Sequence, residues 1–366
     1  MAVVSDAAFG NAARGDWPAR AVAQAWHLLT AIPTDMSCLL ASLCAVAIAV
    51  VYLTIRGGRS CRRLRPRRLL KVLLAPSYFL RRTHGLDVLM AIFNTRVVGW
   101  TIGILLISGT YFAVGTYDLL VRAYGPAQLS SWPPWAVTAV SSVILWLSYE
   151  FAYWLDHYLS HRVPFLWEFH KVHHQAETLS PLTVFRVHPI DSLVFVNILA
   201  ICIGSVNGIL HFSFGIPIEQ VSYFGYGLIL AAFSYLIIQL QHSHVWIPFC
   251  GIWGRLFISP AHHQIHHSDN PAHFNKNLGS CLAIFDWLFG SLHVPSRQRE
   301  KLSFGVAPMA GEPHTLTEGL VLPFERSWRH IAAWLGMPGG RDAPPETPSA
   351  TGSATQPAPA YPARAA

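Results

Sequence analysis

The chain has 366 residues, of which 52% are hydrophobic and only 12% are charged, and its formal net charge is +7. Soluble domains of this size carry roughly a quarter charged residues, so the composition argues against a water-soluble protein. The positive charge argues for a membrane flank and against a nucleic acid partner, because eleven Lys and Arg residues lie between Arg56 and Arg96, beside apolar runs.

Five apolar runs, taken in chain order, predict membrane-spanning helices. Residues 1–20 lack the basic start and apolar core of a cleaved signal peptide, so none is expected. The runs are close to the length that crosses a ~30 Å hydrocarbon layer, and the glycines of the second run are common in membrane helices. The five runs are Met36–Ile55, Val97–Gly115, Ala136–Trp154, Leu193–Leu210 and Ile218–Leu240.

The segments between these runs predict their orientation. The basic stretch RGGRSCRRLRPRR follows the first run, which places this stretch in the cytoplasm and the N-terminus outside. A short loop with Asp118 and Arg122 follows the second run, and the uncharged turn HFSFGIP joins the last two. Both histidine-rich segments, 157–188 and 242–273, then emerge on the cytoplasmic side. An alternative with four spans makes one hairpin re-entrant.

Histidine is the unusual residue of this chain. There are 19 histidines, and 14 of them lie between His157 and His273. The six cysteines form no CxxC pair, so neither a disulfide framework nor a thiolate metal site is expected. Metal ligands in this chain are therefore expected to be imidazoles.

Three histidine groups have the spacing of metal ligands on helices. Residues i, i+3 and i+4 share one face of a helix, so each group aims two or three imidazoles in one direction. Imidazole binds iron, copper, nickel and zinc, and eight imidazoles exceed one tetrahedral zinc and fit two metals. The groups are His157-x3-His161, His170-x2-His173-His174 and His263-x2-His266-His267.

Other histidines are assigned from their surroundings. His242, at the end of the fifth run, and His188, in FRVHP, are additional candidate ligands. We expect His244, His262 and His273 to support the ligands or to lie at the surface. The remaining single histidines are interpreted as interface residues: His27, His84, His211, His293, His314 and His330.

The ordered set HX3H, HX2HH and HX2HH, with a hydrophobic hairpin before the third group, resembles the fatty acid hydroxylase / sterol desaturase superfamily. The segment Asn275–Leu292 is also similar to the family's closing N-x-N-x-G … D-x-x-F-G element, and the resemblance covers about residues 95–295. It implies a helical membrane protein with two iron ions that uses O2 and external electrons. The implied ligands are His157, His161, His170, His173, His174, His263, His266 and His267, with His242 and His188 as additions.

This chain lacks the fused haem-binding domain of some family members, because GMPGG near residue 337 has no histidine. A separate electron donor, a ferredoxin or a cytochrome b5-like protein, is therefore expected. Ligating imidazoles usually donate their distal N–H to a nearby acceptor. The candidate acceptors are Asp156, Glu168, Glu177, Asp191 and Asp269.

Together these patterns predict an all-α, polytopic transmembrane protein of about four to five spans with a cytoplasmic helical histidine-rich cap. The tail is too poor in large apolar residues to fold alone. The expected divisions are a poorly structured segment 1–35, a first span and basic cytoplasmic segment 36–95, a catalytic domain 96–295, a C-terminal extension 296–338 and a disordered Pro/Ala-rich tail 339–366.

The function expected from the resemblance is O2-dependent hydroxylation of an unactivated C–H bond of a lipid that enters from the bilayer. Desaturation by the same metal centre is the alternative, since both reactions begin with hydrogen abstraction. Tyr149, Trp154, Phe165 and Trp167 are candidates to line the approach, or are membrane anchors. A metal transporter is a third possibility, but transporters place ligands near mid-membrane and these histidines cluster at one face.

Overall fold

The computed structural model of the chain describes residues 36–59, 82–94, 107–215, 237–306 and 315–337. Within these ranges the protein is mostly helical, and its β pairing is limited to two isolated bridges, Phe257–Leu282 and Ser268–Phe304. The all-α class predicted from the sequence is therefore confirmed for the described residues.

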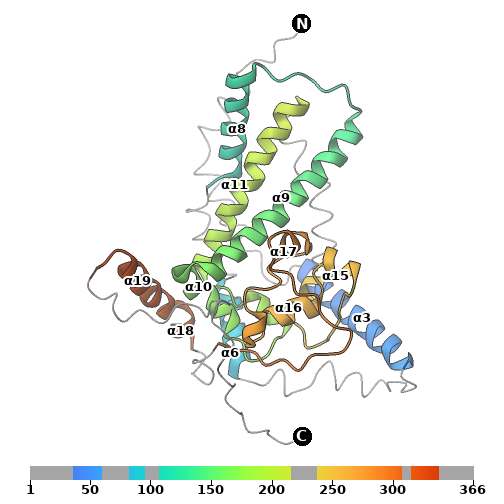
Figure 1. The fold of residues 1–366 in the computed structure, drawn as a ribbon, viewed down its shortest axis with the longest axis vertical. Coiled ribbons are helices and arrows are strands. Elements are labelled where there is room, and N and C mark those ends of the chain that lie inside the picture. Colours follow the sequence, from blue (N-terminus) through green and yellow to red (C-terminus); the bar gives the residue numbers. More distant parts are fainter. Residues whose placement is uncertain (1–35, 60–81, 95–106, 216–236, 307–314, 338–366) are drawn as a thin grey trace, which may run out of the picture.

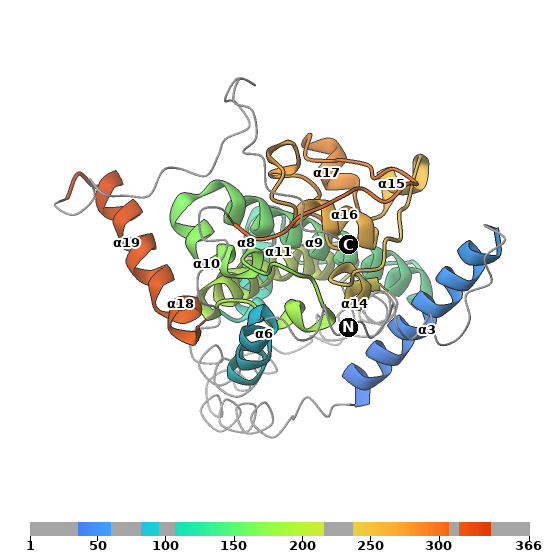
Figure 2. The same cartoon turned by 90° about the horizontal axis from the view of Figure 1, so that it is seen from below.

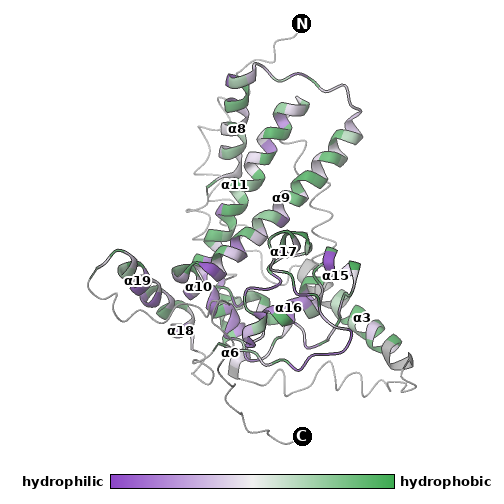
Figure 3. Ribbon diagram, in the orientation of Figure 1, coloured by the Kyte–Doolittle hydropathy of each residue, from purple (hydrophilic) through white to green (hydrophobic). Residues whose placement is uncertain are grey.

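Among the described residues, two helices are long and apolar enough to cross a membrane: α9 (Pro134–Arg162) and α11 (Pro189–Phe214). Both pack together, and α8 (Gly109–Tyr124) packs against α11 (Figure 1). The parts of α8, α9 and α11 that lie away from α10 are mainly apolar, whereas hydrophilic residues concentrate at α10 and α16 (Figure 3). The earlier helix α3 (Met36–Arg59) coincides with the first predicted span.

Small residues bring α8 and α11 into close contact. A Cβ atom added at Gly204 of α11 would lie 2.3 Å from the carbonyl oxygen of Gly109, and one added at Gly208 would lie 2.4 Å from that of Ala113. Both helices thus present small residues four positions apart, the pattern by which membrane helices approach each other closely. These contacts fix α11, whose first turn lies beside the histidines.

Short elements surround the C-terminal end of α9 and the N-terminal end of α11 (Figure 2). The α9 helix ends at Arg162, Val163 caps it, and Pro164 begins α10, which redirects the chain over the end of the long helices. The remaining elements are α6 (Arg82–Phe93), α10 (Pro164–His174), η2 (Pro181–Phe185), α14 (Gln239–Gln241), α15 (Ile252–Leu256), α16 (Pro260–His266), η4 (Pro271–His273), α17 (Ile284–Leu288), α18 (Leu316–Leu320) and α19 (Leu322–Trp334).

Local sequence explains where α16 begins. Ser259 caps the helix by accepting a hydrogen bond from the His262 backbone N–H, while the His262 side chain bonds back to the Ser259 backbone. Pro260 occupies the first turn, where its missing N–H costs nothing. The capping box starts this short helix at a defined residue and thereby sets the direction of His263 and His266.

The structure changes several predicted boundaries. The loop expected around Asp118 and Arg122 is helical, because the apolar residues between them continue α8 until Gly125 ends it at φ 89°. α11 similarly continues to Phe214, into the predicted turn, and ends at Gly215 in the left-handed conformation. The start of the second predicted span, most of the fifth span, the segment 1–35 and the tail 339–366 lie outside the described residues.

Candidate metal centre

Nine of the ten predicted ligand histidines converge at the end of α9 in two adjacent groups. In each group every residue offers one ring nitrogen, and these nitrogens lie within 4.8 Å of one another. We call them the five-histidine group and the four-histidine group. The first contains His157, His161, His170, His174 and His266, and the second contains His173, His242, His263 and His267.

Helical geometry explains why each HX2HH motif contributes to both groups. At about 100° per residue, positions i and i+4 point only about 40° apart, whereas i+3 points about 60° to the other side of i. His170 and His174 therefore join one group while His173 joins the other. His263 and His267 likewise share a group, and His266 joins the opposite one. The sequence predicts that the imidazoles of each motif point in one direction, whereas in the structure each HX2HH motif points them toward two groups.

Hydrogen bonds orient three imidazoles of the five-histidine group. Nδ1 of His157 donates to the Leu278 carbonyl at 2.8 Å, and Nδ1 of His266 donates to the Lys276 carbonyl at 2.9 Å. Nδ1 of His170 lies 3.0 Å from the Asp191 carboxylate. Because carbonyls only accept, the proton sits on Nδ1 of His157 and His266, which leaves an Nε2 lone pair free to bind a metal.

The Nε2 atoms of the five-histidine group are buried and have no hydrogen-bond partner among the described residues. Buried polar atoms are nearly always satisfied, so five unpartnered nitrogens in one place need an explanation. A bound cation would satisfy all of them.

The nitrogens of the four-histidine group are closer together. Nε2 of His242 lies 3.1 Å from Nε2 of His173 and 2.9 Å from that of His263, which is 3.0 Å from Nε2 of His267. Two nitrogens bound at right angles to one ion at ~2.1 Å would be about 3.0 Å apart. The spacing therefore matches neighbouring ligands on a metal, and imidazole is a suitable donor for iron.

Burial keeps these imidazoles neutral at physiological pH. Desolvation lowers the pKa of His242 to about 4 and that of His266 to about 3, although the Lys276 carbonyl partly offsets the effect at His266. Desolvation also lowers the pKa values of His173, His174, His263 and His267 well below the usual value, and neighbouring histidines add to this shift. Neutral imidazole is the form that binds a metal.

The loop after α16 carries the two carbonyls that orient His157 and His266. Asn275 and Asn277 adopt φ values of 57° and 58°, a conformation that Asn tolerates better than other side chains. The Asn277 amide donates to the His262 carbonyl at 3.0 Å, so the loop is tied to α16. Asp286 accepts from the backbone N–H groups of Leu278 and Gly279 at 2.9 and 2.8 Å.

A buried ion pair supports the four-histidine group. Nη1 of Arg186 lies 3.2 Å from the Asp87 carboxylate of α6, and both side chains have 0% exposure. Nε of Arg186 also donates to the Val172 carbonyl of α10 at 3.0 Å. The Arg186 carbonyl in turn accepts from Nδ1 of His173 at 3.3 Å. α6 therefore braces a ligand candidate that it does not contact directly.

Of the predicted acceptor carboxylates, Asp191 bonds to a histidine of the two groups. Glu168 instead pairs with Lys171 and with His330, whose Nε2 lies 3.4 Å away. Asp269 accepts from the Ser303 hydroxyl, Glu177 acts electrostatically on Arg186, and Oδ1 of Asp156 has no hydrogen-bond partner among the described residues. Backbone carbonyls provide the other acceptors, which residue types cannot reveal.

His188 is the predicted ligand that joins neither group. Its Nδ1 accepts from the Ile190 N–H at 3.1 Å, which caps α11, and its Nε2 donates to the Leu320 carbonyl at 3.1 Å. Both nitrogens are therefore occupied in helix capping and packing. His262 is similarly occupied, by Ser259 and the Gly254 carbonyl, in keeping with the supporting role expected of it.

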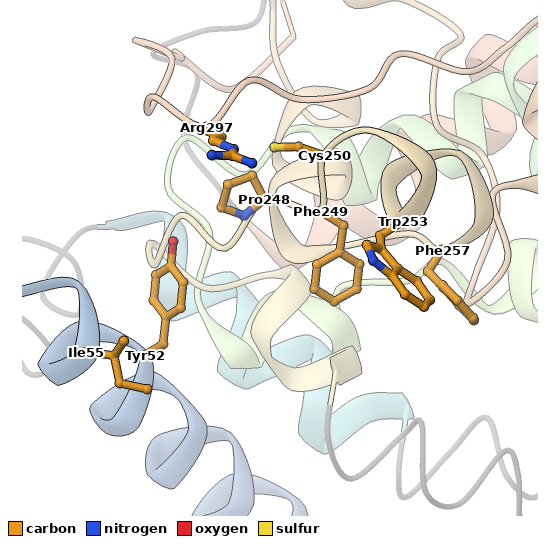
Figure 4. Close-up of a pocket in the computed structure, with 8 residues that line it drawn as sticks. All are labelled: Tyr52, Ile55, Pro248, Phe249, Cys250, Trp253, Phe257 and Arg297. Atoms are coloured by element: carbon orange, nitrogen blue, oxygen red, sulfur yellow. The ribbon is translucent and has the colours of Figure 1, made fainter. Parts of the chain in front are cut away.

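An apolar cavity lies elsewhere in the protein, between α3 and the segment around α15 (Figure 4). Four of the eight described residues that line it are aromatic, and none of the eight is a histidine. The residues that line it are Tyr52, Ile55, Pro248, Phe249, Cys250, Trp253, Phe257 and Arg297. We therefore do not assign the metal chemistry to this cavity.

Comparisons with known proteins match the segment that carries the two histidine groups. Residues 142–291 match the family model of fatty acid hydroxylases. Ornithine lipid hydroxylase OlsE of Rhizobium tropici is 31% identical over 190 residues, which cover 50% of this chain and 53% of the relative. Alkylglycerol monooxygenase of Caenorhabditis elegans is 31% identical over 147 residues, covering 40% of this chain and 25% of the relative.

A protein of Arabidopsis thaliana named as a sterol desaturase is 28% identical over 154 residues, covering 40% of this chain and 46% of the relative. The chain thus spans about half the length, or less, of these curated relatives. No solved structure matches the chain.

Proposed function

We propose that this chain is a membrane-bound di-iron oxygenase of the fatty acid hydroxylase / sterol desaturase superfamily and that it hydroxylates a C–H bond of a lipid. The observation that carries the proposal is that five buried Nε2 atoms have no hydrogen-bond partner in the described part of the chain, while four other Nε2 atoms converge beside them. Each set supplies enough donors for one metal ion. All donors are neutral nitrogens, which suit iron.

We propose the nine histidines of the two groups as the ligands and leave His188 out of the set. Iron bound there supplies the redox chemistry that uses O2 and external electrons. The protein's contribution is to hold the imidazoles neutral and oriented, through Asp191 and the carbonyls of Lys276, Leu278 and Arg186. Burial of all nine histidines also keeps bulk water from the site.

The substrate is proposed to be a lipid that enters from the bilayer with its reacting carbon near the end of α9. Trp167 supports this location, since its ring lies 5.0 Å from that of His161 and 5.5 Å from that of His174. Trp154 is packed differently, against Phe289 at 4.3 Å, and is better placed to hold the loop than to contact a substrate. The names of the relatives make an ornithine lipid and an alkylglycerol the first substrates to assay.

The membrane arrangement remains part of the proposal. Four to five spans, with the histidine groups at the cytoplasmic face, would give a soluble electron donor such as a ferredoxin, or a cytochrome b5-like protein, access to the site. Cysteines introduced near Arg162 and near Gly125, each labelled from one side of the membrane, test this orientation. Labelling of the Arg162 position from outside would contradict it.

Desaturation is the second candidate, and the match to the protein named as a sterol desaturase favours keeping it. Both reactions require the same metal site and the same removal of hydrogen. They differ in whether the product gains an oxygen atom or loses two hydrogen atoms.

The test begins with purified full-length protein loaded with iron. We expect two irons per chain and O2 uptake when a reductant and lipid are added. Lipid analysis of cells with and without the gene should show a product heavier by one oxygen atom. A product lighter by two hydrogen atoms would select desaturation, and metal transport into vesicles without O2 uptake would contradict both.

A further inference from the structure

A third cluster of potential ligands lies outside the two histidine groups. His273, His293 and Glu300 each offer one ligand atom, and these atoms lie within 4.8 Å of one another. Nε2 of His273 is 3.9 Å from a carboxylate oxygen of Glu300, too far for a hydrogen bond. The rings of His273 and His293 have centroids 5.1 Å apart and are inclined by 66°.

The central histidine of this cluster is buried without full satisfaction. His273 has 6% exposure, and its Nδ1 has no hydrogen-bond partner among the described residues. His293 and Glu300 are partly exposed, so one side of the cluster is open to solvent. A buried imidazole with an unpartnered nitrogen, beside a second imidazole and a carboxylate whose ligand atoms lie within 4.8 Å of one another, is a donor set that fits a bound cation.

The backbone holds these three residues in place before any ligand binds. His273 ends η4, whose first turn is capped by Asn270. The His293 N–H donates to the Asn277 side chain at 2.7 Å. The segment that follows Glu300 is held by the Ser268–Phe304 bridge and by a hydrogen bond of 3.1 Å from the Asp269 N–H to the Ser303 carbonyl. The ligands therefore come from three segments that are already tied together.

We propose that His273, His293 and Glu300 bind a third metal ion, a divalent cation of the zinc type, separate from the two histidine groups. Two imidazoles and one carboxylate leave a fourth, solvent-facing position, as in zinc sites with three protein ligands. The ion links residue 273 to residue 300 across the loop that carries the Lys276 and Leu278 carbonyls. It thereby stabilises the acceptors that orient His266 and His157.

The experiment measures zinc, not catalysis. The full-length protein is first loaded with iron to fill the histidine groups, then incubated with zinc alone, desalted and analysed for both metals. We expect wild type to retain one zinc per chain, and Glu300→Gln, His273→Asn and His293→Asn to lose that zinc while keeping their iron. X-ray absorption at the zinc edge should show nitrogen and oxygen neighbours with two imidazoles.

The matched control is Glu325→Gln, which removes an exposed carboxylate on α19 and should retain the zinc. If His273→Asn does not fold, the partly exposed Glu300 and His293 decide the question. Equal zinc in wild type and Glu300→Gln would overturn the proposal, and His273 and Glu300 would then be a simple charge pair. Loss of iron without loss of zinc in these variants would likewise overturn it.

Discussion

The two histidine groups share α10 and α16 but differ in how their imidazoles are fixed. In the five-histidine group, three Nδ1 atoms have acceptors, one of them a carboxylate, and no Nε2 has a hydrogen-bond partner within the described ranges. In the four-histidine group, only His173 has an Nδ1 acceptor, a carbonyl, and the Nδ1 atoms of His242, His263 and His267 have none among the described residues.

This difference predicts unequal metal sites. Acceptors on the distal nitrogen raise ligand basicity and fix ring orientation, so the five-histidine group should bind its ion more tightly. The four-histidine group has fewer donors and weaker orientation, so it should lose its ion first and be more sensitive to the loss of a ligand.

The largest expected effect follows from removing a ligand of the weaker group. His173→Ala leaves three imidazoles, and we expect activity to fall by more than the roughly 10–100-fold that follows loss of an outer hydrogen bond. Iron should fall toward one per chain while membrane insertion is unchanged. His161→Ala leaves four imidazoles in its own group and should retain more iron than His173→Ala.

The control for this pair is His211→Ala, at the distal end of α11, where the ring stacks on Tyr117 at 4.2 Å. It should keep both irons. His330 lies far from the histidine groups in the sequence but is a poorer control, because it contacts Glu168 of α10, the helix that carries His173. Wild-type iron content and activity in His173→Ala would contradict the ligand assignment.

A second, smaller effect comes from the support beneath the four-histidine group. Asp87→Asn breaks the ion pair with Arg186, and removing one partner of a buried pair costs roughly 3–5 kcal/mol. Thermal unfolding should therefore shift to lower temperature, and iron should be lost from the four-histidine group before the other. Glu325→Gln breaks an exposed pair with Arg329 and should change stability by less than about 1 kcal/mol.

The histidines and Asp87 show which parts of the site can be predicted from the sequence and which cannot. The histidine spacing identifies eight of the nine residues that the fold brings together, because helical periodicity relates spacing to direction, and His242 is added from its position at the end of the fifth apolar run. Asp87 was a missed signal: a lone acidic residue in the apolar segment THGLDVLMAIF is costly unless it is paired. Its partner, 99 positions away, could not be inferred from local pattern.

Other features depend on backbone geometry that residue types do not encode. The acceptors for His157 and His266 are carbonyls of Leu278 and Lys276, and any residue has a carbonyl. The split of each HX2HH motif between two groups follows from helical angles once α9, α10 and α16 are placed around a common centre. The assignment of His188 as a ligand candidate rested on its neighbourhood, whereas the structure uses both of its nitrogens to hold α11 and α18.

A third prediction tests the carboxylate that distinguishes the five-histidine group. Asp191→Ala removes the acceptor for Nδ1 of His170, and we expect metal affinity there to fall by about 10–100-fold. Asp191→Asn retains an acceptor oxygen without the charge and should fall less. Asp118→Asn on α8 is the control, and equal affinities in all four proteins would remove the proposed distinction between the groups.

The smallest effect is the one expected at pH 6, because the pH dependence of the loaded protein should differ from that of free imidazole ligands. Ordinary histidines protonate near pH 6.5, but burial lowers the pKa of His242 to about 4 and that of His266 to about 3. Between pH 6.5 and about 4 the unfolded chain therefore binds protons that the folded chain does not. The free energy of unfolding is consequently greatest above pH 6.5 and decreases as the pH falls through this range. Each such histidine contributes up to about 1.4 kcal/mol per pH unit within this window.

Iron should accordingly stay bound at pH 6, where half or more of free imidazoles are protonated, and should leave only as the fold itself weakens toward pH 4. Iron content after desalting and circular dichroism at the same pH values make the comparison, and the four-histidine group should empty at the higher pH. Iron release at pH 6 with an intact helical spectrum would mean that the groups are more accessible to protons than their burial indicates. Simultaneous loss of both irons would remove the inequality between the two groups.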